Sequence, residues 1–341
     1  MSRRALQLVV LAPMWLLMAC APAEVASLSS FYRGMTLGLF PPAAGSEYIR
    51  SSLEEMHALG VNAISVVVPR TTPDVRSESF GYGPAVTPSD ATVVQAIRQA
   101  RALNMRVMLL PIVFVEHLEE GEWRGTLAPE DWDAWFLRYE AMILDYARMA
   151  QAEGVELFSV GSELCSTEHM EERWRALIAK VRRIYDGSLF YSANWDHYQG
   201  IGFLDALDYS GVNAYYQLTE ESRPTVQDLV QAWAPIRQAL LAWSRAHGRP
   251  LLFTEVGYPS REGSAIDPWN HSSTRPASAE EQRRCYRAFV EAWRDVDELS
   301  GVFFYLWWGD GGVEDRDYTP RNKPAARELA RWFGGGDPAK E

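Results

Sequence analysis

Apolar runs and amphipathic stretches alternate along the chain from residue 32 onward. The apolar runs are short and rich in β-branched and aromatic residues, which is typical of strands buried on both faces. The stretches between them repeat apolar residues at helical spacing. The predicted strands are Tyr32–Leu37, Val61–Val68, Arg106–Ile112, Leu157–Glu163, Leu189–Asn194, Tyr209–Ala214, Leu251–Glu255 and Gly301–Trp307. The predicted helices are Ser46–Leu59, Ser89–Leu103, Pro129–Ala152, His169–Ile184, Ile201–Leu207, Thr225–His247, Ala279–Asp295 and Pro324–Phe333.

Capping residues support the predicted helix ends. Ser89 and Asp90 are good N-cap candidates for the second helix. Glycine or asparagine, which tolerate the left-handed conformation, follow four helices. These residues are Gly60, Asn104, Gly154 and Gly248.

Strict strand–helix alternation predicts a parallel sheet closed into a barrel. We therefore expect the α/β class and a single (β/α)8 TIM barrel over residues 31–335, followed by a short tail at 336–341. A doubly wound open sheet usually has a glycine-rich phosphate loop after its first strand. The segment Gly34–Gly38 is not such a loop, and the interior contains no low-complexity linker that would divide the domain.

The N-terminus has the pattern of a secretion signal. Arg3 and Arg4 precede the apolar run Ala5–Met18, which is too short and too interrupted to predict a membrane span. Cys20 then follows a pattern that resembles the bacterial lipoprotein signal, in which the cysteine is acylated. We expect a signal peptide at 1–19, acylated Cys20, a tether at 20–30, and an extracytoplasmic protein anchored by lipid to the periplasmic or outer surface of a bacterial membrane. The alternative is an ordinary signal peptide with a chance cysteine.

The net charge limits which partners the protein can bind, and the cysteine content indicates whether a disulfide is expected. The formal net charge of −12 opposes binding to nucleic acid but not to a neutral polysaccharide. Apart from Cys20, the cysteines are Cys165 and Cys285. Their wide separation gives no evidence of a disulfide, so two buried free thiols are expected. We also expect a monomer.

The chemistry of a TIM barrel is concentrated at the carboxyl ends of its strands. Two apolar runs end in a carboxylate, Glu163 and Glu255, which places costly charges at the rim of a core. Two acids, amides and flat aromatic rings at one mouth suit a sugar, because aromatic faces pack against pyranose C–H groups while polar groups bind hydroxyls. The other residues expected at the mouth are His117, Trp123, Arg124, Ser162, Asn194, Trp195, Asp196, Asn213, Tyr215, Tyr216, Trp307 and Trp308.

A carboxylate pair of this kind supports glycoside hydrolysis by either of two mechanisms. Retaining enzymes hold the carboxyl groups about 5–5.5 Å apart and inverting enzymes roughly 6.5–9.5 Å apart, and spacing in sequence does not choose between them. A structural alternative remains for each residue. A strand-end glutamate can pair with arginine or cap a helix, and each tryptophan can belong to the core.

Other chemistries have little support. The histidines are scattered and form no zinc motif. The chain has no P-loop, and Gly161-Ser162 lacks the second glycine of a nucleophile elbow. We expect no metal and no cofactor.

Several segments resemble family 113 of the glycoside hydrolases, which are retaining TIM-barrel β-mannanases. The matching segments are Phe158–Leu164, Tyr191–Asp196, Phe253–Tyr258, Trp123–Gly125 and Asp208–Tyr215. The resemblance implies an endo-β-1,4-mannanase-like activity on a polysaccharide or oligosaccharide.

The same resemblance implies roles for individual residues. Glu163 would be the general acid/base and Glu255 the nucleophile. Tyr215 would orient the nucleophile, Trp307 would form the floor of the reacting sugar's subsite, and Asn194 and Trp195 would line the cleft. Trp123 is also expected to bind substrate.

Two positions depart from the family pattern. Leu110-Pro111-Ile112 stands where the family tends to have Lys-Pro-His, and Pro69-Arg70 replaces an aromatic pair. Both changes remove polar or stacking groups from the non-reducing side of the cleft. A glycan-binding surface lipoprotein without catalysis, and a transglycosylase acting on an envelope glycan, therefore remain as alternatives.

Overall fold

The computed structural model describes residues 31–41 and 45–335 and confirms the predicted TIM barrel. The predicted signal peptide, acylated Cys20, tether and C-terminal tail lie outside the described residues. Eight strands pair in chain order into a closed barrel whose ladders are all parallel. The strands are β1 (Tyr32–Leu37), β2 (Ala63–Thr72), β3 (Arg106–Val115), β4 (Leu157–Ser162), β5 (Ser188–Asn194), β6 (Ser210–Asn213), β7 (Leu251–Val256) and β8 (Leu299–Trp307).

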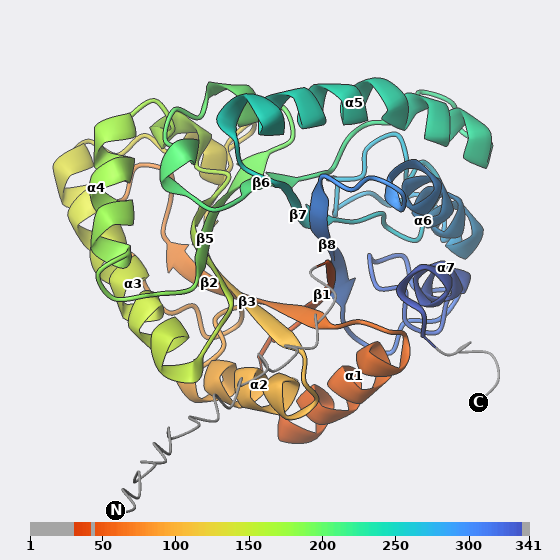
Figure 1. Ribbon diagram of the computed structural model, residues 1–341, viewed down its shortest axis with the longest axis horizontal. Coiled ribbons are helices and arrows are strands. Elements are labelled where there is room, and N and C mark those ends of the chain that lie inside the picture. The colour runs from red at the N-terminus through yellow and green to blue at the C-terminus, as the bar shows by residue number, and fades with distance from the viewer. Residues whose placement is uncertain (1–30, 42–44, 336–341) are drawn as a thin grey trace, which may run out of the picture. The chain divides into compact units, whose positions relative to one another are not determined.

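The helices surround the strands, as Figure 1 shows. They are α1 (Ser46–Ala58), α2 (Asp90–Ala102), α3 (Trp132–Glu153), α4 (Glu171–Val181), α5 (Val226–His247), α6 (Ala279–Trp293) and α7 (Pro324–Phe333). One apolar cluster fills the space between the strands and the helices. A second cluster fills the inside of the barrel, where side chains from alternate strand positions meet. Its buried members are Tyr32, Ala63, Met108, Leu110, Leu157, Phe190, Leu252 and Phe303.

The capping predictions are confirmed. The backbone φ angles of Gly60, Asn104, Gly154 and Gly248 are 85°, 57°, 65° and 62°, all in the left-handed region. Ser89 is the N-cap of α2, and its hydroxyl accepts a hydrogen bond from the backbone N–H of Thr92. Local chemistry in the sequence therefore determines where these helices begin and end.

The predicted helix at Ile201–Leu207 is wrong. The chain between β5 and β6 instead forms two 3₁₀ turns, Tyr198–Gly200 and Leu204–Ala206. Gly200 and Gly202 disfavour helix propagation there, and a stretch this short cannot offset the cost of helix nucleation.

Strands β2 and β3 extend beyond their predicted ends. They stay paired in one continuous register from Ala63 opposite Arg106 to Thr72 opposite Val115. Pro69 and Pro111 do not end them, because Pro69 lies opposite Ile112 and Pro111 opposite Val68 within that ladder. Strands β2 and β3 therefore extend beyond the end of β4 at the carboxyl side of the barrel.

Strand β8 contains an irregularity next to the barrel mouth. Met35 of β1 lies opposite Phe304, but Leu37 lies opposite Trp307, so β8 contributes an extra residue over this interval. An extra residue reverses the side-chain alternation beyond it. Phe304 and Trp307 consequently both pack into the cluster between the barrel and the helices.

Both described cysteines are free. Cys285 is buried as expected, whereas Cys165 is only partly buried because it lies in the 3₁₀ turn that follows β4. Within residues 31–41 and 45–335, no helix combines the length and the apolar character needed to cross a bilayer.

Candidate active site

Glu163 follows the last residue of β4 in a backbone conformation that is unusual for a glutamate. Its φ angle is +55°, in the left-handed region, and its N–H donates a 2.9 Å hydrogen bond to the carbonyl of Ser192 on β5. A non-glycine residue in this region stores about 1–2 kcal/mol of strain. Strain of this kind is concentrated at functional sites.

Two donors hold the Glu163 carboxylate, which is 6% exposed. Arg124 donates from Nε at 3.0 Å and approaches with Nη2 at 2.9 Å, both to Oε2. The Asn213 amide donates to Oε1 at 2.9 Å. Asn213 is fully buried, and the Thr254 hydroxyl donates to its Oδ1 at 2.8 Å, which fixes the orientation of the amide.

Glu255 lies near the end of β7 and is also 6% exposed. The Tyr215 hydroxyl donates to its Oε2 at 2.8 Å. Burial and then the charge of Glu163 raise the pKa of Glu255 to about 7, while Arg124 and the Tyr215 hydrogen bond oppose the rise. The two carboxylates are therefore electrostatically coupled, as expected of acids that face one cavity.

Arg124 is the cation of this cluster. Burial lowers its pKa, but the charges of Glu163 and Glu255 outweigh that effect and raise it overall. Burial and the charge of Glu255 raise the pKa of Tyr215 well above its ordinary value, so its hydroxyl stays protonated and donates. At neutral pH the cluster holds two carboxyl groups, one guanidinium and a neutral phenol.

A second layer of polar groups supports the turn at Glu163. The N–H of Leu164 donates to the Tyr191 hydroxyl at 2.7 Å, and that hydroxyl donates to Oε1 of Glu168 at 2.8 Å. Burial raises the pKa of Glu168 to about 7, and the charge of Glu163 contributes to the rise. The backbone after Glu163 is therefore tied to a buried carboxyl group.

Three other predicted site residues contact neighbours at the carboxyl end of the barrel or in the loop before Arg124. Asn194 is 8% exposed at the end of β5, and its amide donates to Asp196 at 2.6 Å. Trp195 packs in one apolar cluster with Tyr215. Trp123 precedes Arg124, and its ring lies over Gly125.

The structure corrects the expected position of Trp307. Its ring is 3% exposed and packs between the barrel and the helices, because the irregularity in β8 turns it outward. The aromatic residue of β8 near the glutamates is Tyr305. Burial and then the charge of Glu255 raise the pKa of Tyr305, and Glu163 adds to the rise while Arg124 opposes it, so Tyr305 belongs to the same electrostatic cluster.

The sequence did not predict the partners that Arg124, Asn213 and Tyr305 have at this site. Arg124 and Asn213 were expected at the barrel mouth, but no partner was assigned to either of them. Strand alternation was a usable signal for Tyr305, since it shares the inward face with Phe303. The irregularity that removes Trp307 from that face left no signal in the sequence.

The two departures from the family pattern have different surroundings. Ile112 is half-buried against the cluster inside the barrel. Arg70 lies on the opposite face of β2 from Pro69 and stacks over Tyr82, with 3.8 Å from its guanidinium carbon to the ring centroid. Beyond Ile112, the same face of β3 presents Phe114, which is 40% exposed.

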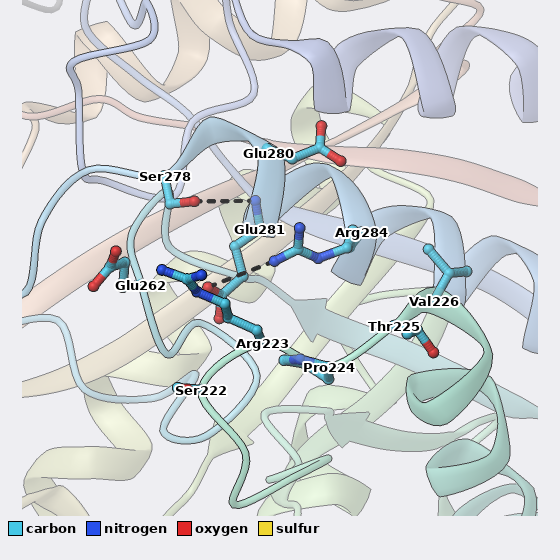
Figure 2. A pocket seen from close by; sticks show the side chains of 10 residues that line it. All are labelled: Ser222, Arg223, Pro224, Thr225, Val226, Glu262, Ser278, Glu280, Glu281 and Arg284. Atoms are coloured by element: carbon cyan, nitrogen blue, oxygen red, sulfur yellow. Dashed lines mark hydrogen bonds and ion pairs between the residues drawn. The ribbon is translucent and has the colours of Figure 1, made fainter.

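A separate cavity of about 570 Å³ lies beside the first turns of α5 and α6 (Figure 2). It is lined by charged side chains that include Arg223, Glu262, Glu280, Glu281 and Arg284. None of the predicted site residues lines it. The coupled pair of glutamates, and not this cavity, therefore defines the candidate active site.

Among the described residues, no group of three or more histidine, cysteine, aspartate or glutamate side chains is placed to hold a metal ion. The polar atoms around the two glutamates come from an arginine, an asparagine and a tyrosine. These groups suit the binding and proton transfer that a glycoside requires.

Coupled carboxyl groups at the carboxyl end of a TIM barrel are the arrangement that glycoside hydrolases use, and comparison with known proteins places this chain in that class. Residues 43–323 match the model of Glycoside Hydrolase Family 113, and the chain belongs to this family. No curated protein sequence matched the chain.

Solved structures are similar to this chain over the whole barrel. The family 113 β-mannanase AaManA from Alicyclobacillus acidocaldarius, in complex with ManMIm, is 31% identical with a TM-score of 0.80, covering 89% of this chain and 97% of that chain. A family 113 β-1,4-mannanase is 25% identical with a TM-score of 0.79, covering 90% and 99%. A family 5 mannosidase from Rhizomucor miehei, 11% identical with a TM-score of 0.57 and covering 89% and 92%, is similar in fold.

Proposed function

We propose that this glycoside hydrolase is an endo-β-1,4-mannanase that retains anomeric configuration, with Glu163 as the general acid/base and Glu255 as the nucleophile. The observation that carries the proposal is the coupling of two carboxyl groups, each 6% exposed, through the charge of Glu163 and the shared neighbour Arg124. The family 113 structures described as β-mannanases support mannan as the substrate.

In the first half of the proposed reaction, the Glu255 carboxylate attacks the anomeric carbon. Glu163 gives its proton to the glycosidic oxygen, the C–O bond breaks, and a glycosyl ester forms on Glu255. The Tyr215 hydroxyl donates to Oε2 of Glu255 and so fixes the orientation of the attacking carboxylate. In the second half, Glu163 takes a proton from water, whose oxygen displaces Glu255 and restores the original configuration.

The position of one proton controls this scheme. Without substrate, Arg124 contacts the Glu163 carboxylate, while burial and the charge of Glu163 raise the pKa of Glu255. Catalysis requires the proton on Glu163 and the charge on Glu255. Substrate binding must therefore replace the contact between Arg124 and Glu163 with one between Glu163 and the glycosidic oxygen, while the charge of Arg124 continues to stabilise ionised Glu255.

Purified protein and the variants Glu163→Gln and Glu255→Gln, assayed on mannans, glucans and chitooligosaccharides, test the proposal. We expect wild type to cleave mannan and each variant to lose at least about 100-fold in kcat, since acid–base catalysis alone contributes about 10²–10⁴-fold. Glu120→Gln is the matched control on an exposed carboxylate, and it should retain wild-type activity. Equal rates in all four proteins would reject catalysis by the pair.

The products distinguish the alternative functions. Proton NMR of the first product reports the anomeric configuration, and a β product indicates retention. Mass spectrometry separates shortened chains from the elongated chains of a transglycosylase. Glycan binding that survives both substitutions, without any turnover by wild type, would identify a binding protein instead.

We also propose that Cys20 carries lipid and anchors the enzyme outside the cytoplasm. The basic residues Arg3 and Arg4, the apolar run after them and the Ala19-Cys20 junction support this location. In a bacterial host fed labelled palmitate, the wild-type chain should take up label and enter the detergent phase of a Triton X-114 extract, and Cys20→Ser should do neither. Equal labelling of both proteins would reject the anchor.

A further inference from the structure

Trp269 presents an indole ring to solvent in the loop between β7 and α6. It is 43% exposed, and among the tryptophans of the described residues it alone is exposed, whereas the others are buried or half-buried. One face of its ring stacks on Trp195, with centroids 5.4 Å apart and an angle of 21° between the planes. The opposite face is therefore the open one.

The backbone on both sides of Trp269 is held by a buried arginine. Arg261 is 2% exposed, and its guanidinium donates to the carbonyl of Asp267 at 3.2 Å and to that of Asn270 at 2.6 Å. It also donates to the Asp267 carboxylate at 3.1 Å, and Arg275 reaches the same oxygen at 2.9 Å. The exposed ring thus projects from a fixed segment, which lowers the entropy lost when a ligand binds.

The same segment is connected to the catalytic cluster. The Tyr318 hydroxyl donates to the carbonyl of Pro268 at 2.5 Å. The Tyr318 ring packs edge-on against Tyr215, with centroids 6.2 Å apart, and Tyr215 in turn contacts Glu255. Trp195 directly follows β5 at the barrel mouth. The stacked rings therefore lie at the carboxyl end of the barrel and are linked to Glu255 through Tyr318 and Tyr215.

We propose that Trp269, backed by Trp195, is a subsite that binds one pyranose ring of a β-1,4-linked hexose chain extending beyond the cleaved bond. The open indole face is flat and apolar, and the face of a pyranose ring presents C–H groups of matching size. A protein partner would need about 800 Å² of surface, far more than one indole face offers. The inference rests on the established glycoside hydrolase class and on β-1,4 linkage, and it does not require mannose.

The test compares substrate lengths, because a subsite beyond the cleaved bond is filled only by longer chains. For wild type, Trp269→Ala, Trp269→Phe and Leu137→Ala, kcat/KM is measured on mannotriose and mannohexaose and on the corresponding cellooligosaccharides. We expect Trp269→Ala to lower the hexaose-to-triose ratio about two- to twelvefold, the range that one aromatic stacking contact gives. Trp269→Phe should restore most of the ratio. Leu137, 70% exposed on α3, is the control that leaves it unchanged.

Affinity electrophoresis through gels containing galactomannan or hydroxyethyl cellulose provides a second readout that does not depend on turnover. If wild type cleaves mannan but Trp269→Ala keeps its length ratio and its retardation, the subsite is refuted and the proposed function stands. If wild type cleaves no mannan, yet a glycan gel retards it and Trp269→Ala loses the retardation, the proposed substrate is refuted and the subsite stands. Loss of retardation in Leu137→Ala as well would refute the subsite.

Discussion

Glu255 shows how one buried side chain connects catalysis to stability. Its carboxyl group is 6% exposed, and burial together with the charge of Glu163 raises its pKa to about 7 from an ordinary value of 4.5. A raised pKa means that the folded protein binds the proton more tightly than the unfolded chain does. Folding is therefore favoured while the proton is bound, and this contribution is lost as the pH rises through 7.

Glu255→Gln should make the enzyme more stable, but only at higher pH. At pH 4 the carboxyl group is protonated in both states, so the variant and wild type should unfold with similar free energies. Between pH 4.5 and 7 wild type loses stability that the neutral glutamine keeps, and at pH 8 the difference should reach about 3 kcal/mol.

Urea unfolding of both proteins across this pH range measures the difference. Glu120→Gln, which removes an exposed carboxylate, serves as the control and should show no such divergence. A difference between Glu255→Gln and wild type that is constant with pH would contradict the raised pKa of Glu255.

At the scale of elements, the end of β4 is held in position by side chains of α3, α4 and β5 that pack around it. Gly161 lies two residues before Glu163, and a Cβ atom there would meet Trp174 of α4 at 2.7 Å, Tyr191 of β5 at 2.9 Å and Tyr139 of α3 at 3.0 Å. The Tyr139 hydroxyl also donates to the carbonyl of Val160 at 2.9 Å. Three aromatic side chains thus fix the strand end from which Glu163 projects.

Gly161→Ala should therefore lower stability and activity together. Overpacking of this kind typically costs about 1–3 kcal/mol of stability. If β4 moves to relieve the clash, the Glu163 carboxylate moves away from Asn213. Thermal unfolding measures the effect on stability, and kcat on the glycan that wild type cleaves fastest measures the effect on activity. Gly200→Ala, where nothing lies within 4 Å of the added Cβ, should change neither. Full kcat in Gly161→Ala would show that β4 does not set the position of Glu163.

At the scale of the whole molecule, closure of the barrel joins the first strand to the last. Strand β1 pairs with both β2 and β8, so every strand has two neighbours and no edge is free. Gly34 is part of this junction, since a Cβ at that position would lie 2.3 Å from the Phe303 ring. Inside the barrel, the glycine on β1 therefore leaves the space that the large Phe303 ring of β8 occupies.

Gly34→Ala should destabilise the entire barrel in one step. We expect a single unfolding transition in urea, shifted to lower concentration equally by far-ultraviolet circular dichroism and by tryptophan fluorescence. The reason is that opening the β1–β8 junction leaves two long strand edges unpaired. Transitions that separate between the two probes would indicate that part of the barrel unfolds independently.

The sequence by itself determined the order of elements, their parallel arrangement and the capping of the helices at Ser89, Gly60 and Gly154. These features follow from local hydrophobic periodicity and from the conformational preferences of single residues. The strand-end glutamates were found in the same way, since a charge that ends an apolar run is visible without coordinates. The helix expected at Ile201–Leu207 does not form, because Gly200 and Gly202 disfavour it and the segment is too short to offset the cost of helix nucleation.

Only the tertiary structure decided which side chains share the site. Arg124 reaches Glu163 across 39 positions of sequence, and Asn213 reaches it across 50. Tyr305 keeps the inward face that ordinary alternation gives it, whereas Trp307 leaves that face because of one extra residue in β8, which is detectable only against the register of β1. Hydrophobic periodicity reflects the local geometry of each helix and strand. Contacts and charge coupling between distant residues depend on how the eight strands close into one barrel.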